Sequence, residues 1–225
     1  VIPAFASGLD ARPAVKAFFM DRGEPIVDAV ISLTGFSLVG GPAYNDTHAA
    51  QEMLEALDVP YLAVQGLEFQ SLQDWESSSM GLMPVEATMM VAIPELDGAT
   101  GSMVFGGRSE RSAGEKFDMQ PAPERIDRLA DRVARLVALR HTPIAERKVA
   151  IVLFNFPPNS GAAGTAAHLS VFESLYNTLS AMRAEGYRVD LPDSHAALRD
   201  AILKGNAKRF GAEANVYQRV PVDDH

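Results

Sequence analysis

The feature that most constrains the fold is an alternation of short apolar runs with longer amphipathic stretches. Apolar runs of strand length lie at 1–6, 29–34, 60–64, 89–93, 149–156 and 187–191. The run at 149–156 is almost continuously apolar, as expected for a strand that helices cover on both faces. This alternation predicts an α/β fold in which mostly parallel sheets are flanked by helices.

Five stretches place apolar residues at helical spacing beside capping or stop residues. They begin near Pro13, at 45–47, after Pro123, after Thr165 and after Asp193. The first helix, with Asp10 placed to cap it, is expected to end before Gly23. The fourth is expected to stop at Gly186 and the fifth near Gly205.

A polar, turn-rich stretch at 107–114 interrupts the alternation. Glycine, serine and charged residues predominate there, as is typical of a connection between compact units. We therefore expect two Rossmann-like lobes. The first is an α/β lobe at 1–115 that carries acidic strand-end loops, and the second comprises a helix and an α/β lobe at 116–206. The remaining residues, 207–225, are expected to form an irregular tail.

The composition excludes several classes of function. A net charge of −9 argues against general nucleic-acid binding, which needs a basic surface. The absence of cysteine excludes disulfides, thiolate metal sites and cysteine nucleophiles. No apolar run reaches the roughly 18 residues that span a bilayer, and none has the pattern of a signal peptide. The chain opens on an apolar run without an initiator methionine, so we expect an excised piece of a longer protein.

Histidine and serine chemistry finds no support in the spacing of these residues. The 5 histidines are scattered, so a zinc site is not expected. No serine lies in a G-x-S-x-G setting, so serine-hydrolase chemistry is not expected either. The 9 methionines suit either the wall of an apolar pocket or the filling of a core.

Acidic residues follow the expected strands between 60 and 98. Ligands of open α/β sheets bind at the carboxyl ends of the strands, so these acids are expected to converge on one cleft. Clustered carboxylates suit a hard cation such as Mg²⁺. The alternative for each acid is a helix cap or a solvent-facing position. The residues are Glu68, Glu76, Glu86, Glu95 and Asp97, with Glu76 beside Trp75, the only tryptophan.

Two further segments suit the binding of an anion. A Pro/Gly-rich loop between Asn155 and His168 leads from an expected strand into a helix, where backbone N–H groups can face a phosphate or a propionate. Neither a G-x-G-x-x-G nor a Walker A pattern is present, and a tight strand-to-helix turn is the alternative. Arg12 follows the first apolar run and is expected to pair with a carboxylate of a ligand or of the protein.

Several separate stretches resemble one protein family, the large, porphyrin-binding subunits of magnesium chelatase and of the related aerobic cobaltochelatase. They occur in the same order as in that family, at 5–15, 57–61, 75–98, 104–108, 155–158 and 164–167. The stretches Pro84-Val85-Glu86-Ala87 and Glu95-Leu96-Asp97-Gly98-Ala99 are closer to the magnesium branch than to the cobalt branch.

The resemblance implies a fragment of the subunit that takes part in ATP-dependent insertion of Mg²⁺ into protoporphyrin IX, in chlorophyll or bacteriochlorophyll biosynthesis. It implies that two separate ATPase subunits use the ATP and that the remaining domains of the same long chain complete the subunit. The location it implies is the cytoplasm of a bacterium or the stroma of a plastid.

The resemblance also implies roles for individual residues. Glu68, Glu86 and Glu95 are the expected catalytic carboxylates, which would take up the protons that the pyrrole nitrogens lose. Glu86 and Glu95 are also the expected ligands of magnesium. The residues expected to bind the porphyrin are Arg12, Trp75, Asp97, Arg108, Asn155 and His168.

Three other interpretations remain open at this point. The chain is a cobaltochelatase fragment if it binds a corrinoid rather than a porphyrin. It is a docking module if its acidic surface recruits the ATPase subunit while other parts of the parent chain bind the ligand. A small-molecule sensor of the periplasmic-binding type shares the two-lobed α/β layout, but only fold-level analogy supports it.

Overall fold

The computed structural model describes residues 1–225 except 7, 42–43, 110–117, 156–162, 167 and 205–225. The contacts divide the chain into two compact units, Val1–His141 and Thr142–His225. The helix after Pro123 lies in the first unit, whereas the sequence pattern suggested that it belongs to the second lobe. The domain bounds at 115 and 206 stay a prediction, and the expected tail at 207–225 lies outside the described residues.

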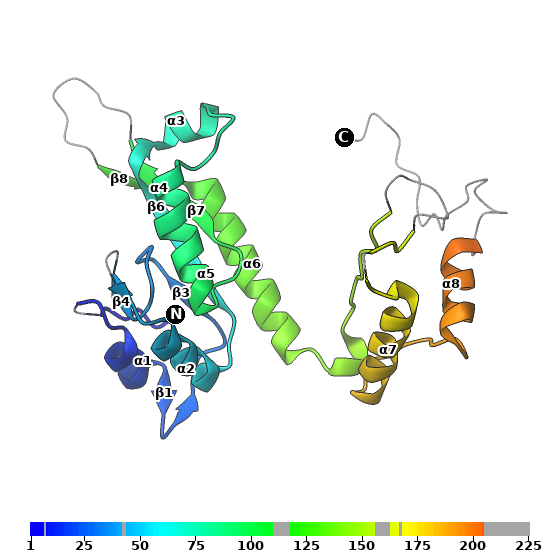
Figure 1. The fold of residues 1–225 in the computed structure, drawn as a ribbon. Coiled ribbons are helices and arrows are strands. Elements are labelled where there is room, and N and C mark those ends of the chain that lie inside the picture. Colours follow the sequence, from blue (N-terminus) through cyan, green and yellow to red (C-terminus); the bar gives the residue numbers. More distant parts are fainter. Residues whose placement is uncertain (7, 42–43, 110–117, 156–162, 167, 205–225) are drawn as a thin grey trace. The chain divides into compact units, whose positions relative to one another are not determined.

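The first unit is built on a mixed, mostly parallel sheet of four strands (Figure 1). In spatial order the strands are β3 (Val30–Ser32), β6 (Tyr61–Ser71), β7 (Met103–Arg108) and β8 (Met119–Pro121). β6 pairs in parallel with β3 and β7, and β8 pairs antiparallel to β7 at the edge. The predicted α/β class with a mostly parallel sheet is therefore confirmed for this unit.

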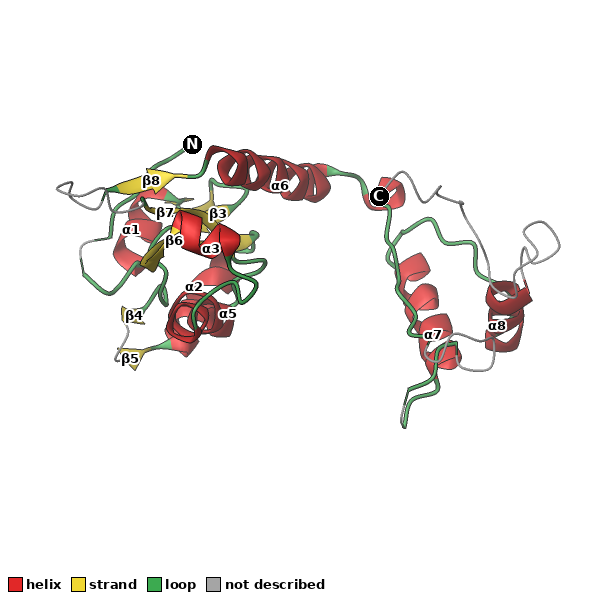
Figure 2. Ribbon diagram, turned by 90° about the horizontal axis from the view of Figure 1, so that it is seen from above, coloured by secondary structure: helices red, strands yellow, loops and turns green. Residues whose placement is uncertain are grey.

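Helices cover both faces of this sheet. Figure 2 shows its strands between α6 on one side and α2 and α5 on the other. The helices of the first unit are α1 (Arg12–Phe18), α2 (Thr47–Leu57), α3 (Leu72–Ser77), α4 (Pro84–Glu86), the π-helix η1 (Ala87–Ala92), α5 (Ile93–Asp97) and α6 (Pro123–His141). The expected helices at 13–22, after 45 and after Pro123 are confirmed, with α1 ending earlier than expected.

The core of the first unit lies between β3, β6, α1 and α2. Leu57 and Ala50 of α2 and Val64 of β6 are completely buried. Asp46 caps α2 by accepting the N–H of Ala49 at 3.0 Å, which satisfies one of the free donors of the first turn. Two short hairpins complete the unit, β1 (Met20–Asp21) with β2 (Glu24–Pro25) and β4 (Gly40–Gly41) with β5 (Tyr44–Asn45).

The predicted strand at 89–93 is wrong, because the residues from Pro84 to Asp97 are helical. A short apolar run does not by itself distinguish a strand from a buried helix. The decisive signals are Pro84 at the helix start and Gly98, which ends the helix with a φ of 109°. Pro94 lies within the helical run, and the π-helix that precedes it widens the turn where a proline ring would clash with an earlier carbonyl.

Two strands of the sheet were not expected, β7 and β8. Gly106 and Gly107 lie in β7, where the sequence suggested a connection. A Cβ on Gly107 would come within 2.8 Å of Leu67 Cβ, so this glycine allows β6 and β7 to approach closely. The paired glycines therefore belong to the strand and mark a tight contact rather than a turn.

The second unit contains η2 (Ile144–Glu146), α7 (Val171–Ala184) and α8 (His195–Lys204). Gly186 follows the end of α7 with a φ of 94°, and α8 ends at Lys204, as expected. In the described part of this unit, the one strand-type pairing is an isolated bridge between Asn155 and Ala163. No helix in the described ranges is long and apolar enough to cross a membrane.

The strands expected at 1–6, 187–191 and in the described part of 149–156 are not formed. Val152 is 93% exposed and Phe154 is 65% exposed, so the strand is not covered by helices as expected. A single apolar run has the composition of a strand, but its N–H and C=O groups form a strand only when a neighbouring strand pairs with them. The structure accordingly does not show two Rossmann-like lobes.

Candidate functional site

The candidate site lies where the segment 72–98 packs against the carboxyl-terminal part of β6. Its central residue is Glu86, which is completely buried at the end of α4. Pro84 opens the helix and places Glu86 in its third position, from which its Oε2 accepts the N–H of Met83 at 3.0 Å. Local sequence therefore directs this carboxylate back to the helix start and into the protein.

Gln70 of β6 is the partner of this carboxylate from the sheet. Its Nε2 donates a hydrogen bond to Glu86 Oε2 at 2.5 Å and another to the carbonyl oxygen of Gly81 at 3.3 Å. Glu86 Oε1 has no hydrogen-bond partner among the described residues. A buried carboxylate oxygen without a donor is costly, so Oε1 is a polar position that the described contacts leave unsatisfied.

Asp97 is the second buried carboxylate of the segment, at 1% exposure at the end of α5. Its Oδ2 accepts the N–H of Leu38 at 2.9 Å and so links α5 to the loop that follows β3. Its Oδ1 has no partner within the described part of the chain. Burial is the main cause that raises the pKa of the neighbouring Tyr61 hydroxyl, and Asp97 raises it further.

Glu68 and Glu95 occupy different positions from Glu86. Glu68 lies within β6 rather than after it, because this strand extends to Ser71, and its side chain is exposed. Glu95 is exposed on α5 and does not follow a strand. The described ranges contain no group of three histidine, aspartate or glutamate residues that could hold a metal ion.

Trp75 and Arg108 both lie near the end of β6. Trp75 is half-buried in α3, and the guanidinium carbon of Arg125 lies 5.5 Å from the centroid of its ring, within the range of a cation–π interaction. Arg108 ends β7 and is in register with Ser71 of β6. The structure therefore brings Trp75 and Arg108 to the same end of the sheet.

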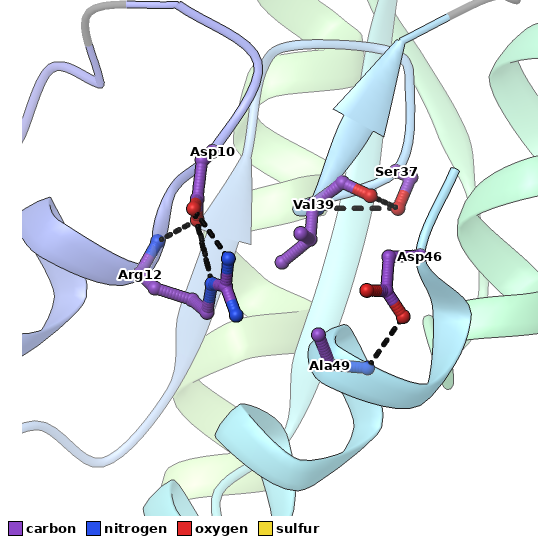
Figure 3. A network of polar contacts seen from close by, with 6 residues as sticks. All are labelled: Asp10, Arg12, Ser37, Val39, Asp46 and Ala49. Atoms are coloured by element: carbon purple, nitrogen blue, oxygen red, sulfur yellow. Dashed lines mark hydrogen bonds and ion pairs between the residues drawn. The ribbon is translucent and has the colours of Figure 1, made fainter. Parts of the chain in front are cut away.

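Arg12 pairs with a carboxylate of the protein rather than with an open position. Figure 3 shows its guanidinium bound to both oxygens of Asp10, with Nη2–Oδ2 at 2.7 Å and Nε–Oδ1 at 2.9 Å. Asp10 Oδ1 also accepts the N–H of Arg12 at 3.0 Å. The N-cap of α1 is Ala11, which has no side-chain cap, so Asp10 lies one residue before the capping position that the sequence suggested. Hydrogen bonding to Arg12 lowers the pKa of the Asp10 carboxyl.

Asn155 and His168 belong to the second unit. Asn155 is exposed and forms the bridge to Ala163. His168 is exposed in a turn with a φ of 61°, and α7 begins only at Val171, so His168 does not lie in the first turn of a helix as expected. The loop residues 156–162 lie outside the described residues.

Gln70, the residue that holds Glu86, was not predicted from the sequence. No motif marks this residue, because an isolated glutamine near the end of a strand is ordinary. The sequence signal that was available is the pairing of a glutamate with a preceding proline at a helix start, which indicates an inward-turned acid.

Comparison with known proteins places the chain in a family. The family model described as CobN/Magnesium Chelatase matches residues 1–225. The chain belongs to this family. The resemblance noted in the sequence is therefore confirmed.

Individual relatives favour the magnesium branch. The chain is 53% identical to the H subunit of the magnesium chelatase of Cereibacter sphaeroides, over 99% of the chain and 20% of the relative. It is 40% identical to the chloroplastic ChlH subunit of the magnesium chelatase of Oryza sativa subsp. japonica, over 100% of the chain and 16% of the relative. It is 27% identical to the CobN subunit of the aerobic cobaltochelatase of Sinorhizobium sp, over 100% of the chain and 18% of the relative.

The chain is thus homologous to one part of the H subunit of magnesium chelatase. It spans a fifth or less of the length of these curated relatives. The chain is more similar to the magnesium-chelatase subunits than to the cobaltochelatase subunit. This agrees with the sequence motifs around Glu86 and Glu95, which are closer to those of the magnesium branch.

Proposed function

We propose that this chain forms part of the porphyrin-binding subunit of magnesium chelatase, the enzyme that inserts Mg²⁺ into protoporphyrin IX with the use of ATP. The observation that supports this most directly, beside the 53% identity to the H subunit of a magnesium chelatase, is the buried carboxylate of Glu86 with one oxygen left without a donor among the described residues. The pathway is chlorophyll or bacteriochlorophyll biosynthesis.

The chemical role of Glu86 in this proposal is that of a proton acceptor. Metal insertion requires that two pyrrole nitrogens lose their protons, and a positioned carboxylate can take up a proton as a general base. Gln70 and the N–H of Met83 hold Oε2 in place, and Oε1 is buried without a donor among the described residues. In the proposal, the segment 72–98 opens to admit the porphyrin, and Oε1 then takes up the proton. A fixed base of this kind loses no side-chain freedom when the substrate arrives.

The exposed carboxylates have a different role in the proposal. The side chains of Glu68 and Glu95 are exposed, and neither carboxylate makes a hydrogen bond or ion pair within the described part of the chain. Their oxygens are thus open to a hydrated Mg²⁺, which prefers oxygen ligands and keeps several of its waters. Glu95, together with Glu86, is proposed to receive the ion as substrate, and Glu68 is proposed to act with them in catalysis.

The remaining proposed contacts serve the macrocycle. Trp75 offers an aromatic face and Arg108 a guanidinium near the end of the sheet, while Asp97 supports the segment from within. Arg12 is proposed to turn from Asp10 to a propionate when the porphyrin binds. Asn155 and His168 are proposed porphyrin contacts from the second unit. The full set of proposed substrate-binding residues is Arg12, Trp75, Asp97, Arg108, Asn155 and His168.

The proposal includes partners that act with this chain. Two ATPase-type subunits use the ATP, and the remaining domains of the longer subunit complete the pocket. We also propose that a neighbouring region pairs with the apolar segment 149–155, whose exposed Val152 and Phe154 would complete a second α/β lobe. The proposed location is the cytoplasm of a bacterium or a plastid stroma, since the relatives include a chloroplastic one.

The test is a chelation assay with the full-length subunit, both ATPase subunits, ATP, Mg²⁺ and deuteroporphyrin IX. Glu86→Gln is expected to lower the rate by at least ~100-fold, since general bases contribute about 10²–10⁴-fold. Porphyrin affinity should stay within about twofold, because Gln keeps the acceptor oxygen for Met83. Gln73→Ala, an exposed change on α3, is the matched control. A Glu86→Gln subunit with normal melting temperature and normal chelation would contradict the proposal.

A further inference from the structure

A cavity of about 550 Å³ lies in the first unit, away from Glu86. It is bounded by one face of α1, by the hairpin β1–β2 and by one face of α2. Its volume falls in the range of about 300–1,000 Å³ that is typical of small-molecule sites. The lining includes Val15 and Lys16 of α1, Arg22 of the hairpin, and Ala49, Met53 and Leu57 of α2.

The floor of the cavity is apolar because both helices turn their core-facing side toward it. Val15, Ala49 and Leu57 are buried members of the hydrophobic core, and Met20 and Met53 pack partly against it. On α2 the lining positions recur every three or four residues, which is one face of a helix. The cavity therefore offers an apolar surface on a folded core rather than a loose gap between loops.

Positively charged side chains lie beside the apolar floor of the cavity. Arg12 is neutralised by Asp10, and Glu52 lies 3.5 Å from His48. Lys16 and Arg22 also line the cavity, and neither side chain makes a hydrogen bond or ion pair within the described ranges. Two exposed positive charges next to an apolar floor complement a molecule that has an apolar body and carboxylate groups.

The backbone of Arg22 gives a second, independent indication. Arg22 and Gly23 connect β1 to β2 and have φ values of 50° and 91°, the positive pair of a type I′ turn. Asn or Gly adopts the first of these positions with little strain, whereas a long side chain there strains the backbone. A strained arginine whose side chain lines a cavity indicates that its charge is used there.

We propose that the cavity between α1, the β1–β2 hairpin and α2 binds an apolar carboxylate, with Lys16 and Arg22 holding the carboxylate groups. A porphyrin with its propionates has this chemistry, and to that extent the proposal rests on the proposed function. A fatty acid has the same chemistry, and the two are separated below by the probe that binds.

The experiment is isothermal titration calorimetry of the 225-residue chain with three probes: deuteroporphyrin IX, its dimethyl ester and dodecanoate. The dicarboxylate is expected to bind at least about tenfold more tightly than the ester, since each charge-assisted hydrogen bond contributes about that factor. Tight binding of dodecanoate instead would identify a fatty acid as the class of ligand. Failure of both acids to bind, or equal binding of acid and ester, would overturn the proposal.

Variants locate the binding in this cavity. Arg22→Asn removes the charge and suits the turn, so the melting temperature should stay level or rise while affinity falls about tenfold. Arg22→Lys should retain most of the affinity. Ala56→Phe fills the cavity from an exposed helical position and should abolish binding without a loss of charge. Arg135→Gln, an equal charge change on exposed α6, should have no effect.

The outcomes separate this proposal from the proposed function. If the porphyrin binds but Arg22→Asn and Ala56→Phe leave its affinity unchanged, the cavity is not the site, while the role of Glu86 in chelation stands. If the cavity variants lose dodecanoate binding and chelation by the full-length protein is unaffected, the cavity stands and does not serve the porphyrin.

Discussion

Gln70 Nε2 donates a hydrogen bond to the buried carboxylate of Glu86 at 2.5 Å and thereby joins β6 to the start of α4. The two residues are 16 positions apart in the sequence. Glu86 is a completely buried acid of the first unit. A charge-assisted hydrogen bond of this kind both positions the carboxylate and offsets part of the cost of its burial.

Gln70→Ala should destabilise the first unit, because Glu86 Oε2 would keep only the N–H of Met83 as a donor. The expected loss is about 1–3 kcal/mol in the free energy of unfolding. Urea unfolding followed by the fluorescence of Trp75, which lies in the neighbouring α3, measures it. Gln73→Ala is the control and should change the stability by less than ~0.5 kcal/mol. Equal stability of the two variants would mean that the Gln70 contact contributes nothing.

Asp97→Ala should be more harmful than Asp97→Asn. Alanine leaves the buried N–H of Leu38 without an acceptor, at an expected cost of about 1–3 kcal/mol, whereas asparagine keeps an acceptor oxygen at the same position. Chemical denaturation of both variants, with Glu95→Ala on the same helix as the exposed control, gives the comparison. An alanine variant as stable as the asparagine variant would rule out the Leu38 contact as the reason for burying Asp97.

Two glycine substitutions in the sheet should differ in their effect. A Cβ on Gly106 would fall on the backbone oxygen of Gln120, so Gly106→Ala should separate β7 from β8 and cost about 1–3 kcal/mol. A Cβ on Gly66 would meet the end of the Met119 side chain at 2.8 Å, which can rotate away, so Gly66→Ala should cost less. Thermal unfolding by circular dichroism checks the order, and a reversed order would contradict the β7–β8 register.

The Asp10–Arg12 pair predicts that the stability of the fold depends on pH at acidic pH values. Its hydrogen bond from Arg12 lowers the folded-state pKa of Asp10 below the value in the unfolded chain. The ionised pair therefore stabilises the fold above the unfolded pKa of about 3.9, and this stabilisation is lost as the pH falls through the folded pKa. Because the pair is exposed, the effect on stability is small and salt-sensitive.

Carboxyl NMR titration measures this shift directly. Arg12→Gln should raise the titration midpoint of Asp10 toward its ordinary value, in part only, because the N–H of Arg12 remains as a donor. Lys16→Gln lies one turn further along α1 and should leave the midpoint unchanged. If Arg12→Gln and wild type titrate at the same pH, the guanidinium contact is absent in solution.

The sequence predicted the elements whose signals are local. The helix after Asp46, the helix that starts at Pro123 and the stop at Gly186 depend on caps and apolar spacing within a few residues, and all are confirmed. The family resemblance was likewise predictable from sequence motifs, and the α/β class from the alternation of apolar runs with amphipathic stretches. Such features need no knowledge of distant contacts.

The elements that the sequence did not predict depend on neighbours. The run at 89–93 has the composition of a strand, but no strand pairs with it among the described residues, and Pro84 and Gly98 delimit a helix. The glycines of β7 lie in a strand because Leu67 and Gln120 approach them from both sides. The apolar run at 149–155 has no pairing strand in the described part of the chain, so its strand-like composition produced no strand.

The sequence by itself determined which acidic residues are present near the site, and the tertiary structure decided which of them is buried. Glu68, Glu86 and Glu95 are three glutamates of the same part of the sequence, but of these three only Glu86 is buried. The reason is that burial of a carboxylate requires donors from elsewhere in the fold, and Gln70 on β6 reaches Glu86 alone among the three. Caps and periodicity act over a few residues, whereas the surroundings of a carboxylate are set by segments that meet only when the chain has folded.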